Sequence, residues 1–305
     1  MYFKDIIGQQ TLKERLLRSV EDNRLAHALL LTGPGGNGKL PIAVALARYI
    51  LCSNRADGDA CGRCPSCVKM DKLMHSDLHF VFPVKKKKNT PSDRNPVSDD
   101  YITEWREIFQ KSPYFSYSDW LAKLEVENQQ PIIYERESSE ILHKLTMKSR
   151  EGGWKIMIIW LPEKMNEACA NKLLKIIEEP PAETLFLLVS ENAEPILPTI
   201  LSRTQRIEIP RIADADIAAA LVQRYALDGQ TARTIAVQSG GDWEKAEGML
   251  VVNSTKAQYL ELFMTLMRMA YKRDIKAMKQ WSEQVAALGR ERQKALLEYC
   301  QRMIR

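Results

Sequence analysis

No apolar run in the sequence is long enough to cross a membrane. Runs such as residues 156–161 and 185–189 fall far short of the roughly 18 residues that a membrane span needs. The chain also begins MYFKDIIGQQ, which contains no apolar signal region. Both absences argue against a membrane protein and favour the cytoplasm, where thiols stay reduced.

A strong excess of charge of one sign is also absent. The 44 Lys and Arg residues face 39 Asp and Glu residues, for a net charge of +5. With 45% hydrophobic and 27% charged residues, the composition is that of a globular protein and excludes a disordered chain or a polycation. The length of 305 residues corresponds to about two domains and excludes a disulfide miniprotein. The small basic excess lies in residues 251–305, so the net charge of the chain does not indicate nucleic-acid binding.

Apolar periodicity alternates between strand and helix over the first two thirds of the chain. This alternation predicts an α/β fold in which helices cover both faces of a parallel sheet. From residue 214 onward, only helical periodicity is found. Strands are predicted at 28–32, 154–160 and 184–189, and helices at 4–23, 41–52, 101–111, 118–124, 138–149, 166–179, 195–202, 214–225, 230–239, 242–250, 256–273 and 275–305.

A glycine-rich turn follows the first predicted strand. Residues 33–40 read GPGGNGKL and fit the phosphate-loop pattern G-x-x-x-x-G-K-[ST] at every fixed position but the last. The glycines let backbone N–H groups close around phosphate oxygens, and the lysine reaches the terminal phosphates. A glycine turn without this role is the alternative. The predicted phosphate-binding residues are Gly33, Gly35, Gly36, Gly38 and Lys39.

The groups that hold Mg²⁺ in phosphate-loop ATPases are missing. The last position of the pattern normally gives a hydroxyl to the metal, and here it is Leu40. The strand predicted at 154–160 runs into Leu161 and Pro162 instead of ending in a carboxylate, and Glu163 is the nearest acid. We therefore expect weak ATP binding or none.

Four of the six cysteines have the spacing C-x8-C-x2-C-x2-C. Four thiolates so close together in a reduced chain predict a closed, structural Zn²⁺ site. An iron–sulfur cluster and free thiols are the alternatives. The predicted ligands are Cys52, Cys61, Cys64 and Cys67. We interpret the two nearby histidines as surface or capping residues and the other two cysteines as packed thiols, namely His75, His79, Cys169 and Cys300.

Several segments together resemble the clamp-loader subunits of bacterial DNA polymerase III, which belong to the AAA+ class. The resemblance covers roughly residues 3–82 and 138–250. It implies an AAA+ domain at 1–210 with a zinc module at 52–67, a helical lid domain at 211–250 and a helical collar domain from 251. The segments are FKDIIGQQ at 3–10, RLAHALLLTGPGGNGK at 24–39, the four-cysteine insert, NKLLKIIEEPPAETLFLLVSE at 171–191 and PTILSR at 198–203.

The family contains ATP-hydrolysing tau/gamma subunits and a stator type, delta-prime, with a degenerate nucleotide site. Leu40, Leu161 and Pro162 align with the Mg²⁺ partners of the hydrolysing type, and Glu244 aligns with its phosphate-contacting lid arginine. A carboxylate at that position repels phosphate. The resemblance therefore implies the stator type, which hydrolyses no ATP. The alternatives are an ATP-hydrolysing tau/gamma-type subunit and a zinc-containing nucleic-acid-binding module without clamp-loader partners.

The resemblance also gives a role to Arg203. Ser202 and Arg203 match the family's Ser-Arg-Cys motif, with Thr204 in place of the cysteine. In the family this arginine enters the ATP site of the neighbouring subunit and stabilises charge on the transferred phosphoryl group. The implied partners are the tau/gamma and delta subunits, with the sliding clamp and primed DNA reached through the complex. Polymerase activity belongs to the DNA polymerase III holoenzyme.

Two parts of the chain fit the family less well. Residues 83–137 form an atypically long insertion that starts with a polar segment, including a lysine run at 85–88, and no role is implied for it. We interpret the lysine run as a solvated loop, with a phosphate-binding patch as the alternative. The chain stops at Arg305 inside a predicted helix, so we expect the collar to be truncated.

Overall fold

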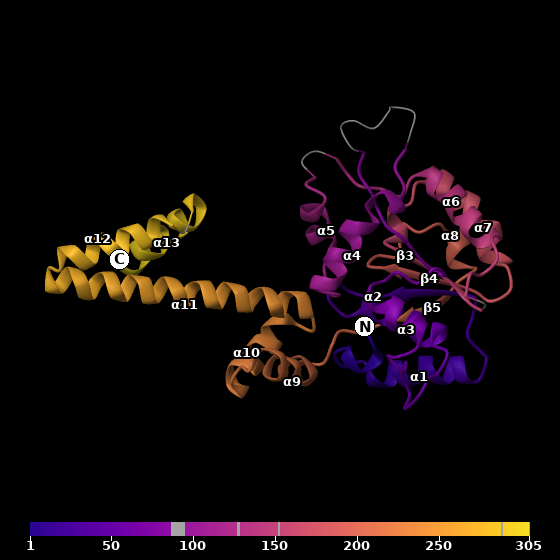
Figure 1. The fold of residues 1–305 in the computed structure, drawn as a ribbon, viewed down its shortest axis with the longest axis horizontal. Coiled ribbons are helices and arrows are strands. Elements are labelled where there is room, and N and C mark those ends of the chain that lie inside the picture. The colour runs from indigo at the N-terminus through magenta and orange to yellow at the C-terminus, as the bar shows by residue number, and fades with distance from the viewer. Residues whose placement is uncertain (87–94, 127–128, 152, 288, 305) are drawn as a thin grey trace. The chain divides into compact units, whose positions relative to one another are not determined.

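The computed structural model describes residues 1–86, 95–126, 129–151, 153–287 and 289–304 (Figure 1). The chain divides into two compact units, Met1–Lys245 and Ala246–Arg305. The division into three domains at 1–210, 211–250 and 251–305 stays a prediction.

A parallel five-stranded sheet forms the centre of the first unit. Its strands are β1 (Ala28–Thr32), β2 (Leu78–Val81), β3 (Lys155–Trp160), β4 (Thr184–Ser190) and β5 (Gln205–Glu208). They lie in the order β2-β3-β4-β1-β5. Every residue of β1, β3 and β4 is buried, as expected for strands covered on both faces. These are the three strands that the sequence predicts.

Helices cover both faces of this sheet. They are α1 (Gln10–Glu21), α2 (Lys39–Leu51), α3 (Pro65–Asp71), α4 (Ile102–Lys111), α5 (Tyr117–Lys123), α6 (Glu135–Thr146), α7 (Glu167–Glu178) and α8 (Pro198–Leu201). The next two helices, α9 (Asp214–Tyr225) and α10 (Gly229–Ser239), pack against each other. Leu29 and Leu31 of β1 belong to one core, with α2 and α4, whereas Leu30 belongs to the other, with α6 and α7. Figure 1 shows α6 and α7 on one side of the sheet and α4 and α5 on the opposite side. The predicted α/β fold class is confirmed.

The first helix is shorter than the predicted 4–23. Only a 3-10 turn forms at Phe3–Asp5, and α1 begins at Gln10. Gly8 and Gln9, between the two, have φ angles of 61° and 59°, which are incompatible with a continuous right-handed helix. Ile6 is extended, with φ −79° and ψ 130°, so the 3-10 turn and α1 are separate elements.

The described part of the insertion is packed against the sheet. The Trp105 ring of α4 stacks on Phe82 with ring centroids 4.2 Å apart. The Trp120 ring of α5 contacts Trp105 edge-on, and its Nε1 donates to the Pro83 carbonyl at 2.8 Å. Helices α4 and α5 agree within one residue with the helices predicted at 101–111 and 118–124. The described half of the lysine run is Lys85 and Lys86, and residues 87 and 88 lie outside the described residues.

In its described residues, the second unit contains helices and short connections between them. It contains most of α11 (Trp243–Lys272), together with α12 (Ile275–Ala286) and α13 (Arg290–Ile304). Helix α11 is continuous where two helices were predicted, and two helices, α12 and α13, take the place of the single helix predicted at 275–305. Its small core contains Tyr259, Leu262, Leu296 and Cys300. In the described ranges of the whole chain, no helix is both long and apolar enough to cross a membrane.

Candidate functional site

The phosphate loop connects β1 to α2, so the predicted strand, turn and helix are confirmed. Gly36 has a φ angle of 65°, and a Cβ placed on it would overlap the carboxylate of Asp242. Asn37 donates from Nδ2 to the Ile209 carbonyl at 2.6 Å. The loop is therefore held by groups from residues 209 and 242, far away in the sequence.

Lys39 is held by the loop itself. Only 5% of this residue is exposed, and its Nζ donates to the Pro34 carbonyl and, at 3.1 Å, to Asn37 Oδ1. Burial lowers the pKa of Lys39 to about 8, although nearby Glu191 and Glu163 act in the opposite direction. The ammonium thus has acceptors inside the protein and is directed back onto its own loop.

Acidic residues surround the loop. Burial raises the pKa of Glu191, which lies just past β4, and the carboxylate of Asp242 lies directly beside Gly36. Glu163 Oε1 accepts hydrogen bonds from the backbone N–H groups of Glu191 and Asn192, at 2.9 and 3.3 Å. Negative charge beside the loop disfavours a phosphate there.

The residues that replace Mg²⁺ partners offer the metal no oxygen. Leu40 is buried in the core beneath the loop, and Leu161 is buried after β3. Glu244, in the first turn of α11, is hydrogen-bonded to the side chain of Ser116, and burial raises the pKa of Glu244 to about 7. Its carboxyl group is thus engaged by the insertion.

Tyr114 is the residue of this site that the sequence did not reveal. It lies between α4 and α5, and its hydroxyl accepts a hydrogen bond from the Ile7 backbone N–H at 2.9 Å. Its ring lies against Gly38 of the phosphate loop and 6.2 Å from the ring of Trp243, between centroids. A lone tyrosine in an insertion has no motif around it, so no sequence pattern indicates this contact.

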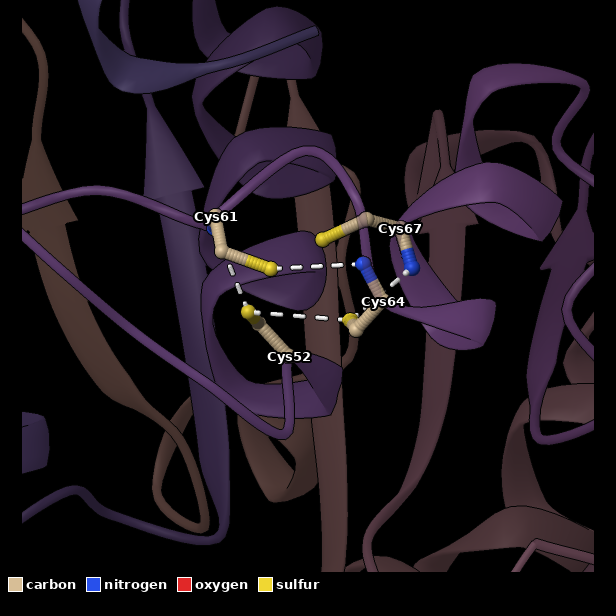
Figure 2. Close-up of side chains that lie close together, drawn as sticks. All are labelled: Cys52, Cys61, Cys64 and Cys67. Atoms are coloured by element: carbon tan, nitrogen blue, oxygen red, sulfur yellow. Dashed lines mark hydrogen bonds between the residues drawn. The ribbon is translucent and has the colours of Figure 1, made fainter.

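The four predicted cysteine ligands come together at the end of α2 and the start of α3. Figure 2 shows the four side chains gathered around a common space, and their sulfurs all lie within 4.8 Å of one another. The Sγ atoms of Cys52 and Cys64 are 3.9 Å apart. A tetrahedral ion with Zn–S bonds of about 2.3 Å requires sulfurs about 3.8 Å apart. The cluster can therefore hold a metal ion.

Arg48 attaches this cysteine module to α2. Its guanidinium is buried, donates to the Cys67 carbonyl at 2.9 Å and pairs with Asp71 at the end of α3. It also lies over the Tyr2 ring, 4.0 Å from the centroid. Because a buried charge needs partners, these contacts fix α3 against the helix that carries the phosphate loop.

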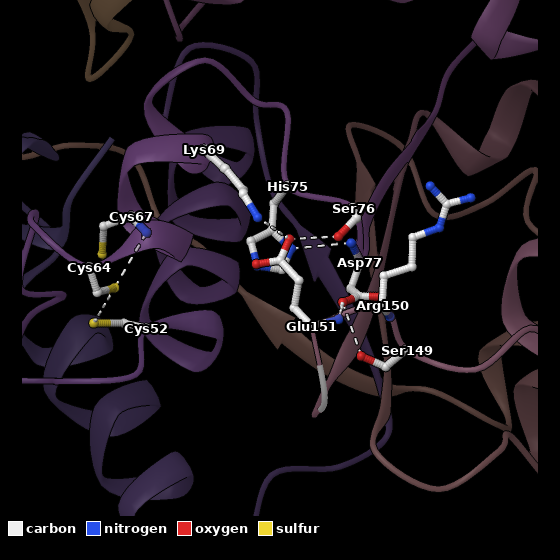
Figure 3. Close-up of polar contacts among 10 residues, drawn as sticks. All are labelled: Cys52, Cys64, Cys67, Lys69, His75, Ser76, Asp77, Ser149, Arg150 and Glu151. Carbon is white, nitrogen blue, oxygen red and sulfur yellow. Dashed lines mark hydrogen bonds and ion pairs between the residues drawn. The ribbon is translucent and has the colours of Figure 1, made fainter.

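Of the two histidines near the module, His75 is buried and is not a surface residue, whereas His79 is partly exposed. The His75 side chain is 2% exposed, and its Nδ1 accepts a hydrogen bond from the Asp77 backbone N–H at 3.1 Å. The proton of the neutral ring is then on Nε2, which faces Glu151 Oε2 at 3.4 Å (Figure 3). The Asp77 carboxylate accepts hydrogen bonds from the Ser149 hydroxyl and from the backbone N–H groups of Arg150 and Glu151, so these contacts join residues 149–151 to the start of β2. Burial lowers the pKa of His79, on β2, to about 4.

Arg203 lies just after α8, at the edge of the described sheet unit. Its Nε donates to Glu178 Oε2 at 2.8 Å, and its Nη1 donates to the Thr199 carbonyl at 3.0 Å. The side chain is 29% exposed. The guanidinium is thus oriented by its own subunit and remains accessible from outside.

The parallel sheet and the glycine-rich loop between β1 and α2 define an α/β protein of the phosphate-loop kind, with a cysteine module that follows α2. The family model described as "DNA polymerase III, delta subunit" matches residues 8–213. The chain belongs to this family, and the clamp-loader resemblance is confirmed.

Curated relatives of two kinds are similar to the chain. DNA polymerase III subunit delta' is 29% identical over 190 residues in Escherichia coli and 28% identical over 199 residues in Bacillus subtilis, covering 62% and 65% of this chain. DNA polymerase III subunit gamma/tau of Mycobacterium tuberculosis is 25% identical over 243 residues, or 78% of this chain. The matches span 44%, 46% and 34% of these relatives, less than half of each.

Proposed function

We propose that this chain is a non-hydrolysing stator of the delta-prime type in the clamp loader of DNA polymerase III. The observation that carries the proposal is the state of the phosphate loop, in which Lys39 is bound by Pro34 and Asn37. ATP hydrolysis needs a lysine directed at phosphates and oxygen ligands for Mg²⁺, and Leu40 supplies no such ligand. The loop is then degenerate, and ATP binds weakly or not at all.

In this role the chain joins tau/gamma and delta subunits in a ring. The ring opens the sliding clamp and sets it on primed DNA in the cytoplasm. Arg203 enters the ATP site of a neighbouring subunit. There its guanidinium leaves its hydrogen bond with Glu178 and binds the phosphates of the nucleotide instead. Its accessible guanidinium supports this assignment.

The metal of the cysteine module is proposed to be zinc. Four thiolates within 4.8 Å of one another are a closed donor set, with no position for a water or substrate. The four residues Cys52, Cys61, Cys64 and Cys67 hold the ion, whose role is to connect the end of α2 to α3. The role of the ion is structural, because four thiolate ligands leave no coordination position open for a reacting group.

An ATP-hydrolysing tau/gamma-type subunit is the second candidate. It is favoured by one observation, that the gamma/tau relative matches a longer stretch of this chain than the delta' relatives do. Against it stand the carboxylates of Asp242 and Glu191 beside the loop.

Steady-state ATP hydrolysis separates the two. We expect no turnover by the isolated chain, because the groups that hold Mg²⁺ are missing. In a complex reconstituted with tau/gamma, turnover should not change when Lys39 of this chain is replaced by Ala. Turnover by the isolated chain that disappears in Lys39→Ala would contradict the proposal. Failure to co-purify with tau/gamma would instead favour a nucleic-acid-binding module without clamp-loader partners.

A further inference from the structure

The insertion reaches the phosphate loop through Tyr114. This residue is buried, and its position is fixed by the ring of Phe115, which lies 5.2 Å from both Trp105 and Trp160 between centroids. On its other side, Ser116 caps α5 by accepting from the Asp119 N–H at 3.2 Å. Tyr114 is therefore held on a packed connection and does not swing freely.

The Tyr114 ring lies where the phosphate loop begins its helix. Its Cε1 is 3.2 Å and its hydroxyl oxygen 3.5 Å from the point where Gly38 would carry a Cβ. Gly38 is the residue before the first turn of α2, the turn whose N–H groups face a bound phosphate. Any side chain at this position would press on the ring.

Two further elements enclose the same ring. The Ile7 backbone N–H donates to the Tyr114 hydroxyl, and the indole of Trp243 lies beside the phenol ring. The Trp243 backbone N–H in turn donates to the Gly36 carbonyl at 3.1 Å. The ring is thus surrounded by the N-terminal segment, the phosphate loop and the first turn of α11.

A nucleoside attached to phosphates on such a loop needs a flat space next to the loop and backbone groups that recognise its polar edge. Tyr114 presents a flat aromatic ring and one polar atom, which is bonded to a backbone N–H group. We infer that Tyr114 is an internal ligand, whose ring occupies the place beside the phosphate loop that the base of a purine nucleoside would take. This inference rests on the proposed non-hydrolysing function, and it adds a steric reason for weak nucleotide binding.

The inference separates two causes of weak nucleotide binding. Glu191 and Asp242 act on phosphate charge, whereas Tyr114 blocks the space for the base. Adenosine has no phosphates, so its binding depends only on the second cause. Removing the Tyr114 ring should therefore admit adenosine even while the carboxylates remain.

The test measures adenosine binding by calorimetry and by the rise in melting temperature, in Tyr114→Ala and in Tyr114→Leu. We expect both variants to bind adenosine at least about tenfold more tightly than the wild type. Tyr114→Leu keeps most of the apolar contact, so it serves if the smaller side chain destabilises the fold. Added p-cresol, which resembles the lost side chain, should stabilise Tyr114→Ala and compete with adenosine.

Two matched variants complete the design. Tyr114→Phe keeps the ring and should not bind adenosine. Tyr117→Ala removes a half-buried tyrosine of the same insertion, whose hydroxyl donates to the Pro131 carbonyl at 3.3 Å, and should also leave adenosine binding unchanged. Folded Tyr114 variants that gain no adenosine binding would overturn the inference without touching the proposed function. Hydrolysis of ATP by the wild type would count against the proposed function instead.

Discussion

Glu137 is a buried carboxyl group outside the phosphate loop. It lies in α6 with 1% of its surface exposed, and its Oε2 accepts from the Ser98 backbone N–H at 2.6 Å. Burial raises its pKa from 4.5 to about 7, although the bond from Ser98 acts in the opposite direction. This carboxyl group fastens the insertion to α6, and its protonation near neutral pH affects stability.

The sign of that effect follows from the raised pKa. Between about pH 4.5 and pH 7 the folded chain keeps a proton on Glu137 that the unfolded chain loses, so stability falls as pH rises through this window. We expect the unfolding free energy of the wild type, minus that of Glu137→Gln, to fall by at most about 1.4 kcal/mol per pH unit there. Other titrating groups, such as His79, are present in both proteins, so their contributions cancel in this difference of unfolding free energies.

Urea unfolding at several pH values measures this difference. Glu140 is a suitable control, because it lies on the same helix and pairs with Arg136 near the surface, so Glu140→Gln should give a nearly flat difference. A flat difference for Glu137→Gln as well would refute the assignment of the raised pKa.

At the scale of elements, the cysteine module determines how α3 attaches to α2. Replacing Cys67 by Ser leaves three thiolates, so we expect elemental analysis to show a fall from about one zinc per chain to nearly none. The melting temperature should fall with it, because the metal connects the end of α2 to α3.

Cys169 provides the matched control for the metal measurement. It is as deeply buried as Cys67, at 0% exposure, but it lies in α7 and belongs to the core between the helices and the sheet. Cys169→Ser should therefore keep its metal. Iron, or no metal, in the wild-type protein would contradict the zinc assignment.

The elements that the sequence predicted correctly are those with an unambiguous apolar pattern. β1, β3 and β4 are continuous apolar runs buried on both faces. β5 was missed because only Ile207 of its four residues is buried, and β2 because it is a four-residue strand containing a histidine. Short or polar edge strands depend on pairing with a neighbour and leave little trace in the sequence.

The continuity of α11 and the position of Tyr114 could not be predicted for different reasons. Residues 251–255 read VVNST, and β-branched residues, Asn and Ser are weak helix formers, so local propensity favoured a break. Ile7 and Tyr114 are in contact although 107 positions separate them in the chain. The cysteine ligands, by contrast, are close in sequence, and their spacing alone indicated the cluster.

At the scale of the whole molecule, the proposed task of the chain is to complete a neighbour's active site. In a complex reconstituted with tau/gamma, Arg203→Ala should lower ATP turnover at the site that the arginine enters by about 10³-fold or more. The physical reason is the loss of a positive charge that stabilises the transferred phosphoryl group. Phosphate release and size-exclusion chromatography measure turnover and assembly separately.

Arg206 offers a control for that experiment. It is also exposed, but its Nε donates to Thr32 Oγ1 of its own subunit at 3.2 Å. We expect Arg206→Ala to change turnover little. Unchanged turnover in an intact complex that carries Arg203→Ala would remove the role in trans.

The strand order also governs when the protein can fold during its synthesis. Among the described residues, β1 pairs only with β4 and β5, which end at Ser190 and Glu208. Until the ribosome has added those residues, Leu29 to Leu31 have no strand beside them, although they are among the most deeply buried residues of the finished protein. Such long-range pairing slows folding and leaves apolar strands exposed in the nascent chain. The sheet that presents the phosphate loop is therefore completed late, after most of the first unit has been translated.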